Sequence, residues 1–153
     1  MNKINIDNYW MKKALNQAYY GEKNGEIPIG SLLVKNNKII SSSWNSCISL
    51  LDISAHAEIL VIRKGSKKLK NYRLYNTTLY VTHEPCFMCS AAIISARINR
   101  IVYGSYSSKK YNFSYFMNLL YIHKIKHHLK DITSGILFHE CSGILKEFFK
   151  KKR

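Results

Sequence analysis

Two short motifs constrain the fold of this chain more than any other feature. His56-Ala57-Glu58 falls in one predicted helix, and Pro85-Cys86-Phe87-Met88-Cys89 begins the next, about thirty residues downstream. One imidazole and two thiols are metal ligands, so the chain has to fold with these two segments together. Structural zinc sites usually have four protein ligands, whereas catalytic sites keep one position for water. Three ligands therefore favour a catalytic metal site.

Each part of this pattern has another interpretation when it is taken alone. His56 could be a core histidine, and Cys86 and Cys89 could be a structural or redox pair. The combination with Glu58 and Pro85 favours the metal site instead.

The residue types also indicate the chemistry. Pro85 suits a helix start, so Cys86 and Cys89 would lie in the first turn, where free N–H groups and the helix dipole favour thiolates. Two thiolates and a neutral imidazole cancel the charge of a zinc ion, so the metal alone acidifies its water less than an all-histidine site would. Glu58 is placed to act as the base and to pass protons to a ring nitrogen and a departing amine. This predicts hydrolytic removal of an amino group from a purine or pyrimidine.

Strand and helix patterns alternate along the chain and predict a single domain over residues 1–153, with no internal repeat and no linker. Its fold class is α/β, with five strands in a central sheet and helices on both faces. Apolar spacing predicts helices over about 7–20, behind an Asp or Asn cap, and over 55–64, 86–97, 116–121 and 135–150. Strands are predicted over about 29–34, 39–44, 78–82, 98–103 and 125–132.

Charge and cysteine content indicate which partners and which cellular compartment suit the chain. The net charge of +15 predicts attraction to polyanions such as nucleic acid, although the abundance of Lys, Asn and Ile is also what an AT-rich genome would produce. Four unevenly spaced cysteines do not make a secreted disulfide framework, and no apolar run is long enough for a membrane span. We expect a cytoplasmic protein with no membrane partner.

The chain resembles the bacterial tRNA-specific adenosine deaminases, of the cytidine/deoxycytidylate deaminase superfamily, from about Asp7 to Phe149. The His-x-Glu and Pro-Cys-x-x-Cys pattern is that of the zinc deaminases. Further matching segments are Glu26-Ile27-Pro28-Ile29-Gly30, Trp44-Asn45, Asp52-Ile53-Ser54-Ala55, Asn71-Tyr72-Arg73-Leu74, Leu79-Tyr80-Val81-Thr82-His83-Glu84, Arg97-Ile98-Asn99-Arg100 and Ile132-Thr133-Ser134-Gly135-Ile136-Leu137.

This resemblance implies a three-layer α/β/α, cytidine-deaminase-like fold around a mixed sheet. It implies one Zn²⁺ per subunit on His56, Cys86 and Cys89, with Glu58 as the catalytic proton shuttle. It also implies that the backbones of Ala57 and Cys86 form part of the pocket. The partner would be the anticodon stem-loop of an arginine tRNA, whose wobble adenosine (position 34) becomes inosine with release of ammonia, in a homodimer.

Asn45, Phe148 and Phe149 are further candidates for contacts with the substrate. Asn45 matches the family asparagine that holds the flipped base, although an Asn after a strand can also make a turn. Phe148 and Phe149, before a basic tail, could clasp a nucleotide, or Phe148 could pack into the core. His83 is expected at the surface and not as a fourth ligand.

The loop over 105–113 departs from the family pattern, because the expected acidic residue and small residues are absent. Tyr106, Tyr111 and Phe113, interleaved with Lys109 and Lys110, could contact RNA by stacking and charge, or could simply fill surface.

Two other functions stay open from the residues alone. A deaminase of free nucleosides, nucleotides or bases would share the zinc chemistry without an RNA surface. An inactive zinc-stabilised RNA-binding module would tolerate the altered loop, but an intact Glu58 argues against it.

Overall fold

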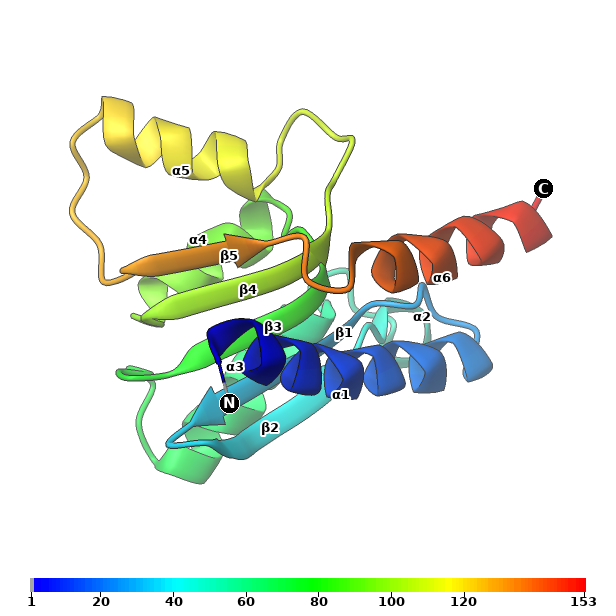
Figure 1. Ribbon diagram of the computed structural model, residues 1–153, viewed down its shortest axis with the longest axis horizontal. Coiled ribbons are helices and arrows are strands. Elements are labelled where there is room, and N and C mark those ends of the chain that lie inside the picture. The colour runs from blue at the N-terminus through cyan, green and yellow to red at the C-terminus, as the bar shows by residue number, and fades with distance from the viewer. Residues whose placement is uncertain (1) are drawn as a thin grey trace.

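A mixed five-stranded sheet forms the centre of the computed structural model, which describes residues 2–153 (Figure 1). The strands are β1 (Gly30–Lys35), β2 (Lys38–Trp44), β3 (Thr78–His83), β4 (Arg100–Ser105) and β5 (Asp131–Ser134), in the spatial order β2-β1-β3-β4-β5. β1 runs antiparallel to β2 and β3, while β3, β4 and β5 are parallel. The carboxyl ends of three strands therefore share one edge of the sheet.

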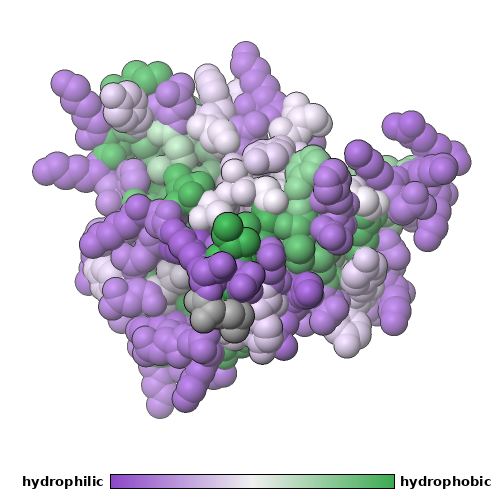
Figure 2. Space-filling model, viewed as in Figure 1, coloured by the Kyte–Doolittle hydropathy of each residue, from purple (hydrophilic) through white to green (hydrophobic). Residues whose placement is uncertain are grey.

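Helices cover both faces of this sheet. They are α1 (Lys3–Lys23), α2 (Cys47–Leu50), α3 (Ala57–Leu69), α4 (Phe87–Ser95), α5 (Phe113–Ile122) and α6 (Phe138–Lys151). α1 and α6 pack on one face, α3 and α4 on the other, and α5 packs beside α4 (Figure 1). The end of α6 stands out from the body as a hydrophilic projection (Figure 2). The predicted three-layer α/β/α fold with a mixed five-stranded sheet is confirmed.

Successive side chains along each strand point to opposite faces of the sheet, and this produces two separate hydrophobic cores. Leu32 and Tyr80 face α1 and α6, and their neighbours Leu33 and Val81 face α3 and α4. Gly104 of β4 lets α6 approach closely, because a Cβ there would lie 2.3 Å from the Sγ of Cys141. Within residues 2–153 no helix has the length and apolar character needed to cross a membrane.

The predicted strand over 125–132 is wrong in its position. Lys124 adopts a left-handed conformation with φ of 54°, and Ile125 is 52% exposed. Regular pairing with β4 starts only where Asp131 meets Arg100. The segment before β5 therefore runs as an irregular basic loop, and the strand itself is shorter than its apolar pattern suggested.

Helix boundaries also differ from the predictions. α1 begins at Lys3, since the side chain of Asn2 accepts a hydrogen bond from the N–H of Asn5 and caps the helix, whereas Asp7 lies buried inside it. α5 begins at Phe113, because the side chain of Asn112 caps it in the same way.

Candidate metal and catalytic site

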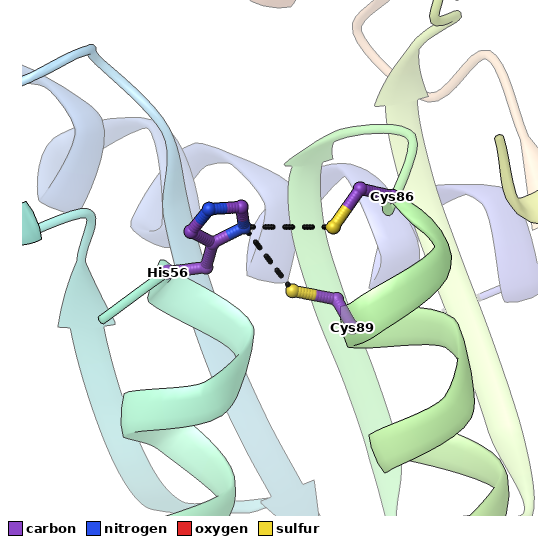
Figure 3. Close-up of side chains that lie close together, drawn as sticks. All are labelled: His56, Cys86 and Cys89. Atoms are coloured by element: carbon purple, nitrogen blue, oxygen red, sulfur yellow. Dashed lines mark hydrogen bonds between the residues drawn. The ribbon is translucent and has the colours of Figure 1, made fainter. Parts of the chain in front are cut away.

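The two sequence motifs meet where α3 and α4 begin, side by side on one face of the sheet. His56 is the N-cap residue of α3, and Cys86 is the N-cap residue of α4, with Cys89 in the first turn. Both cap residues have extended backbone. The side chains of His56, Cys86 and Cys89 point toward one another in the gap between the two helix starts (Figure 3). The sequence predicted both cysteines in the first turn of this helix. Cys89 lies there, whereas Cys86 precedes the turn as the N-cap residue.

The three side chains have the geometry of a metal site. The Nδ1 atom of His56 lies 3.6 Å from the Sγ of Cys86 and 3.4 Å from the Sγ of Cys89. All three donor atoms lie within 4.8 Å of one another. A tetrahedral ion with bonds of about 2.3 Å to sulfur and about 2.0 Å to nitrogen would separate nitrogen and sulfur by about 3.5 Å. The residues present therefore fit a tetrahedral ion with one position left over.

The two thiols differ in how readily they ionise. The hydrogen bond from Cys89 lowers the pKa of Cys86 to about 4, against the effect of burial, and His56 acts in the same direction. That hydrogen bond, together with burial, raises the pKa of Cys89. Cys86 is thus a thiolate at neutral pH, the form that binds a metal ion.

Glu58 lies beside these donors without being one of them. It occupies the first turn of α3, is 4% exposed, and interacts with the thiol of Cys89. Burial raises the pKa of its carboxyl to about 7, while the N–H of Glu58 itself and the neighbouring His56 act in the opposite direction. A buried carboxyl in this position can both take and give a proton.

Two of the other predicted site residues, Asn45 and Ala57, lie in segments that adjoin His56. Asn45 follows β2, is 6% exposed, and accepts a weak hydrogen bond from the thiol of Cys47. The N–H of Ser46 bonds to the carbonyl of Ala55, which joins the Asn45 segment to the residues before His56. Ala57 is fully buried at the start of α3.

Phe148 and Phe149 are not part of this cluster. Both lie near the projecting end of α6, with ring centroids 5.3 Å apart. Phe148 is 9% exposed and packs inward, whereas Phe149 is 47% exposed. Of the two, only Phe149 presents a face to a ligand.

The remaining candidates are His83 and the aromatic residues of the altered loop. The Nδ1 atom of His83 lies 2.7 Å from the hydroxyl of Ser105, and His83 is outside the three-donor group. Phe113 is 1% exposed and belongs to the core, so it cannot stack on a base. Tyr106 and Tyr111 are 52% and 60% exposed. Only these two tyrosines of the altered loop are open to a ligand.

One residue near the site was missed by sequence reasoning. Glu84 is 4% exposed and two positions before Cys86, and its carboxylate accepts hydrogen bonds from the N–H groups of Ser107 and Ser114. A charged residue between a buried strand and a buried helix is a signal for such a role. Its partners could not be found from the sequence, because Ser107 lies in the loop that departs from the family pattern and Ser114 lies just beyond it.

Comparisons with known proteins agree with this geometry. Residues 5–153 match the family model of the MafB19-like deaminases. The chain is 53% identical over 152 residues to the tRNA-specific adenosine deaminase of Buchnera aphidicola subsp. Schizaphis graminum, covering 99% of both chains.

Two solved structures give the same fold. One, from a study of A-to-I editing by tRNA:A34 deaminases at the wobble position of transfer RNA, is 39% identical with a TM-score of 0.82, covering 90% of this chain and 99% of that one. Guanine deaminase from Bacillus subtilis is 32% identical with a TM-score of 0.64, covering 77% of this chain and 76% of that one. The chain belongs to the tRNA-specific adenosine deaminases.

Proposed function

We propose that this protein hydrolyses the wobble adenosine, position 34, of an arginine tRNA to inosine and ammonia, using one zinc ion per subunit. The observation that carries the proposal is the 53% identity to a tRNA-specific adenosine deaminase. This identity extends over 99% of both chains, far beyond the metal motifs. The guanine deaminase from Bacillus subtilis is a base deaminase by its name. Its likeness to this chain is weaker in identity, coverage and TM-score than that of the tRNA:A34 deaminase structure.

His56, Cys86 and Cys89 would hold the zinc ion, since two sulfurs and one nitrogen at these separations suit it. Bound zinc supplies the Lewis acidity that makes water a nucleophile near neutral pH. Glu58 takes a proton from the attacking water and delivers it to the purine N1. It then takes the proton of the new hydroxyl on C6 and gives it to the amino group, which leaves as ammonia while the C6 carbonyl of inosine forms. Its burial keeps bulk water from competing for that proton.

The same helix starts also orient the base. The N–H of Ala57, the first of α3, has no carbonyl partner inside the helix and can donate to the substrate. Asn45 offers an amide, which can donate and accept at the edge of a purine that has been turned out of its stack. Phe149 and the basic end of α6 would contact the RNA outside the pocket.

We also propose that the protein acts as a homodimer in the cytoplasm. Exposed apolar side chains in the segment before His56 support a partner surface there: Ile48, Leu50, Leu51 and Ile53 are 57–93% exposed. Light scattering on the purified protein would return twice the mass of the chain if this is correct.

The first test is incubation of the purified protein with an arginine tRNA that carries adenosine at the wobble position, with inosine read by sequencing. We expect inosine at that position alone, and none with Glu58→Ala, which should keep its zinc. Glu140→Ala, the same change at an exposed position, is the matched control and should behave as wild type. If free bases or nucleosides are deaminated at a rate that added tRNA does not change, the tRNA assignment is wrong.

A further inference from the structure

The loop over residues 106–112, called here the rim loop, is attached to the metal site by one buried carboxylate. Glu84 stands between the end of β3 and Cys86 and is 4% exposed. Its Oε1 accepts the N–H of Ser107 at 3.1 Å, at the beginning of the rim loop. Its Oε2 accepts the N–H and the hydroxyl of Ser114 at 3.0 and 2.9 Å, just after the loop ends. One side chain therefore holds both ends of the loop.

The placement of these donors explains why a carboxylate is needed. Ser114 lies in the first turn of α5, where backbone N–H groups have no partner inside the helix and the helix dipole favours an acceptor. Ser107 donates to the other oxygen. A carboxylate can accept at both oxygens, whereas a glutamine amide has one oxygen and would turn its NH₂ group toward one of the donors.

The rim loop so held forms a wall beside the metal ligands. Cys86 forms an isolated β-bridge with Asn112, the last residue of the loop. The ring of Phe87, next to Cys86, lies 5.4 Å from that of Tyr111. Tyr111 is 60% exposed, and Lys109 and Lys110 precede it. An aromatic ring and two cations thus reach solvent at the border of the site, the combination that binds single-stranded nucleic acid.

We propose that Glu84 is a positioning residue that holds the rim loop against the metal site so that Lys109, Lys110 and Tyr111 meet the RNA around the target base. The proposal rests on the proposed function for the identity of the substrate. It assigns Glu84 no contact with the base or the metal ion.

The test compares Glu84→Gln with wild type in the full-length, zinc-loaded protein, using an anticodon stem-loop as substrate. We expect the KM to rise about tenfold, as for loss of one buried hydrogen bond, with kcat within about threefold and zinc content unchanged. Hydrogen exchange should be faster at the amide of Ser107 and through the rim loop. It should not change in β3 or α4. Ser114→Ala is the matched control, because it removes one hydroxyl bond and leaves both backbone bonds to Glu84.

Three results would overturn the proposal. The first is an unchanged KM, and the second is unchanged exchange in the rim loop. The third is loss of zinc together with faster exchange throughout α4, which would make Glu84 a support of the metal site and not of the loop.

Two further measurements apply if the variant does not fold or if wild type is inactive on tRNA. If Glu84→Gln does not fold, Glu84→Asp keeps the carboxylate but is too short to reach both serines, and it should show the same local release. If wild type does not deaminate tRNA, the proposed function fails separately, since exchange and direct binding of the stem-loop still report whether Glu84 positions the loop for RNA.

Discussion

Arg100 and Asp7 join the N-terminal helix to the middle of the sheet. The guanidinium of Arg100 donates to both carboxylate oxygens of Asp7, each at 2.7 Å, and Tyr80 donates a third hydrogen bond to the same carboxylate. Asp7 is 1% exposed. A carboxylate so deeply buried depends on its partners, because an unpaired charge in this position has lost its hydration.

Replacing Arg100 should therefore destabilise the protein strongly. We expect Arg100→Met to lower the free energy of unfolding by about 3 kcal/mol, because it leaves Asp7 unpaired. The double variant with Asp7→Asn should lose less than the sum of the two single variants. Lys3→Ala is the control: the Lys3–Asp131 pair is exposed, and such pairs contribute less than about 1 kcal/mol. Urea unfolding measures the four variants and wild type, and equal losses for Arg100→Met and Lys3→Ala would contradict this expectation.

The cysteines allow a second comparison between single residues. Cys89 and Cys141 are both fully buried, but only Cys89 belongs to the three-donor group. We expect Cys89→Ala to lose bound zinc and most of the stability linked to it, and Cys141→Ala to keep one zinc per chain with a modest loss of stability. Metal analysis and thermal unfolding would check this. Full zinc occupancy in Cys89→Ala would remove Cys89 from the ligand set.

Among the elements, α2 depends on a side chain from outside it. The carboxylate of Glu26 accepts the N–H groups of Ile48 and Ser49 at 3.0 and 2.9 Å, and so caps this four-residue helix near the site. Burial opposes ionisation of Glu26, but the N–H groups of Ser49 and Ile48 outweigh it, and the pKa of its carboxyl lies below the ordinary value. Its contribution to stability is therefore full above the pKa of an unfolded glutamate and disappears as the pH falls through the lower, folded value.

We expect Glu26→Gln to lower the free energy of unfolding by about 1–2 kcal/mol at pH 7, because two N–H groups lose a charged acceptor. The difference from wild type should shrink as the pH is lowered below about 4, near the ordinary pKa of glutamate. Denaturant unfolding at pH 7, 5 and 3.5 measures this difference. A gap between the two proteins that stays constant over this range would show that Glu26 acts through its shape and not its charge.

The elements show what sequence patterns could and could not predict. Alternation of apolar residues identified β1 to β4, and the two motifs identified the three residues that could hold a metal ion. Each strand and each motif consists of residues close together in sequence. α3 was predicted to stop before Gly65, a residue that usually weakens helices. It continues to Leu69 through Gly65, where a Cβ would lie 2.5 Å from the Cδ2 of Leu33 in β1, so the close packing of α3 on the sheet favours glycine. The true start of β5 and the role of Glu84 depend on distant partners in the same way.

At the scale of the whole molecule, the net charge of +15 produces a general attraction for RNA. Specific contacts are made only by those lysines and arginines that lie where the RNA binds. α6 leaves the sheet at the carboxyl end of β5, the same edge as the metal site, and its end projects from the body (Figures 1 and 2). α3 instead runs away from the site: Lys67 lies ten residues beyond Ala57, or about 15 Å along the helix. The ends of the two helices therefore place their lysine clusters on different parts of the surface (Figure 1).

We compare two variants that lose the same charge, one at the end of α6 (Lys150, Lys151 and Lys152→Ala) and one at the end of α3 (Lys64, Lys67 and Lys68→Ala). We expect the α6 variant to bind tRNA at least about tenfold more weakly at low salt, with the slope of log K against log salt concentration reduced by about 2 to 3, one phosphate contact per lysine. The α3 variant should change both quantities little. Filter binding at several salt concentrations measures them. Equal effects of the two variants would mean that the general positive field, and not a contact made by α6, attracts the RNA.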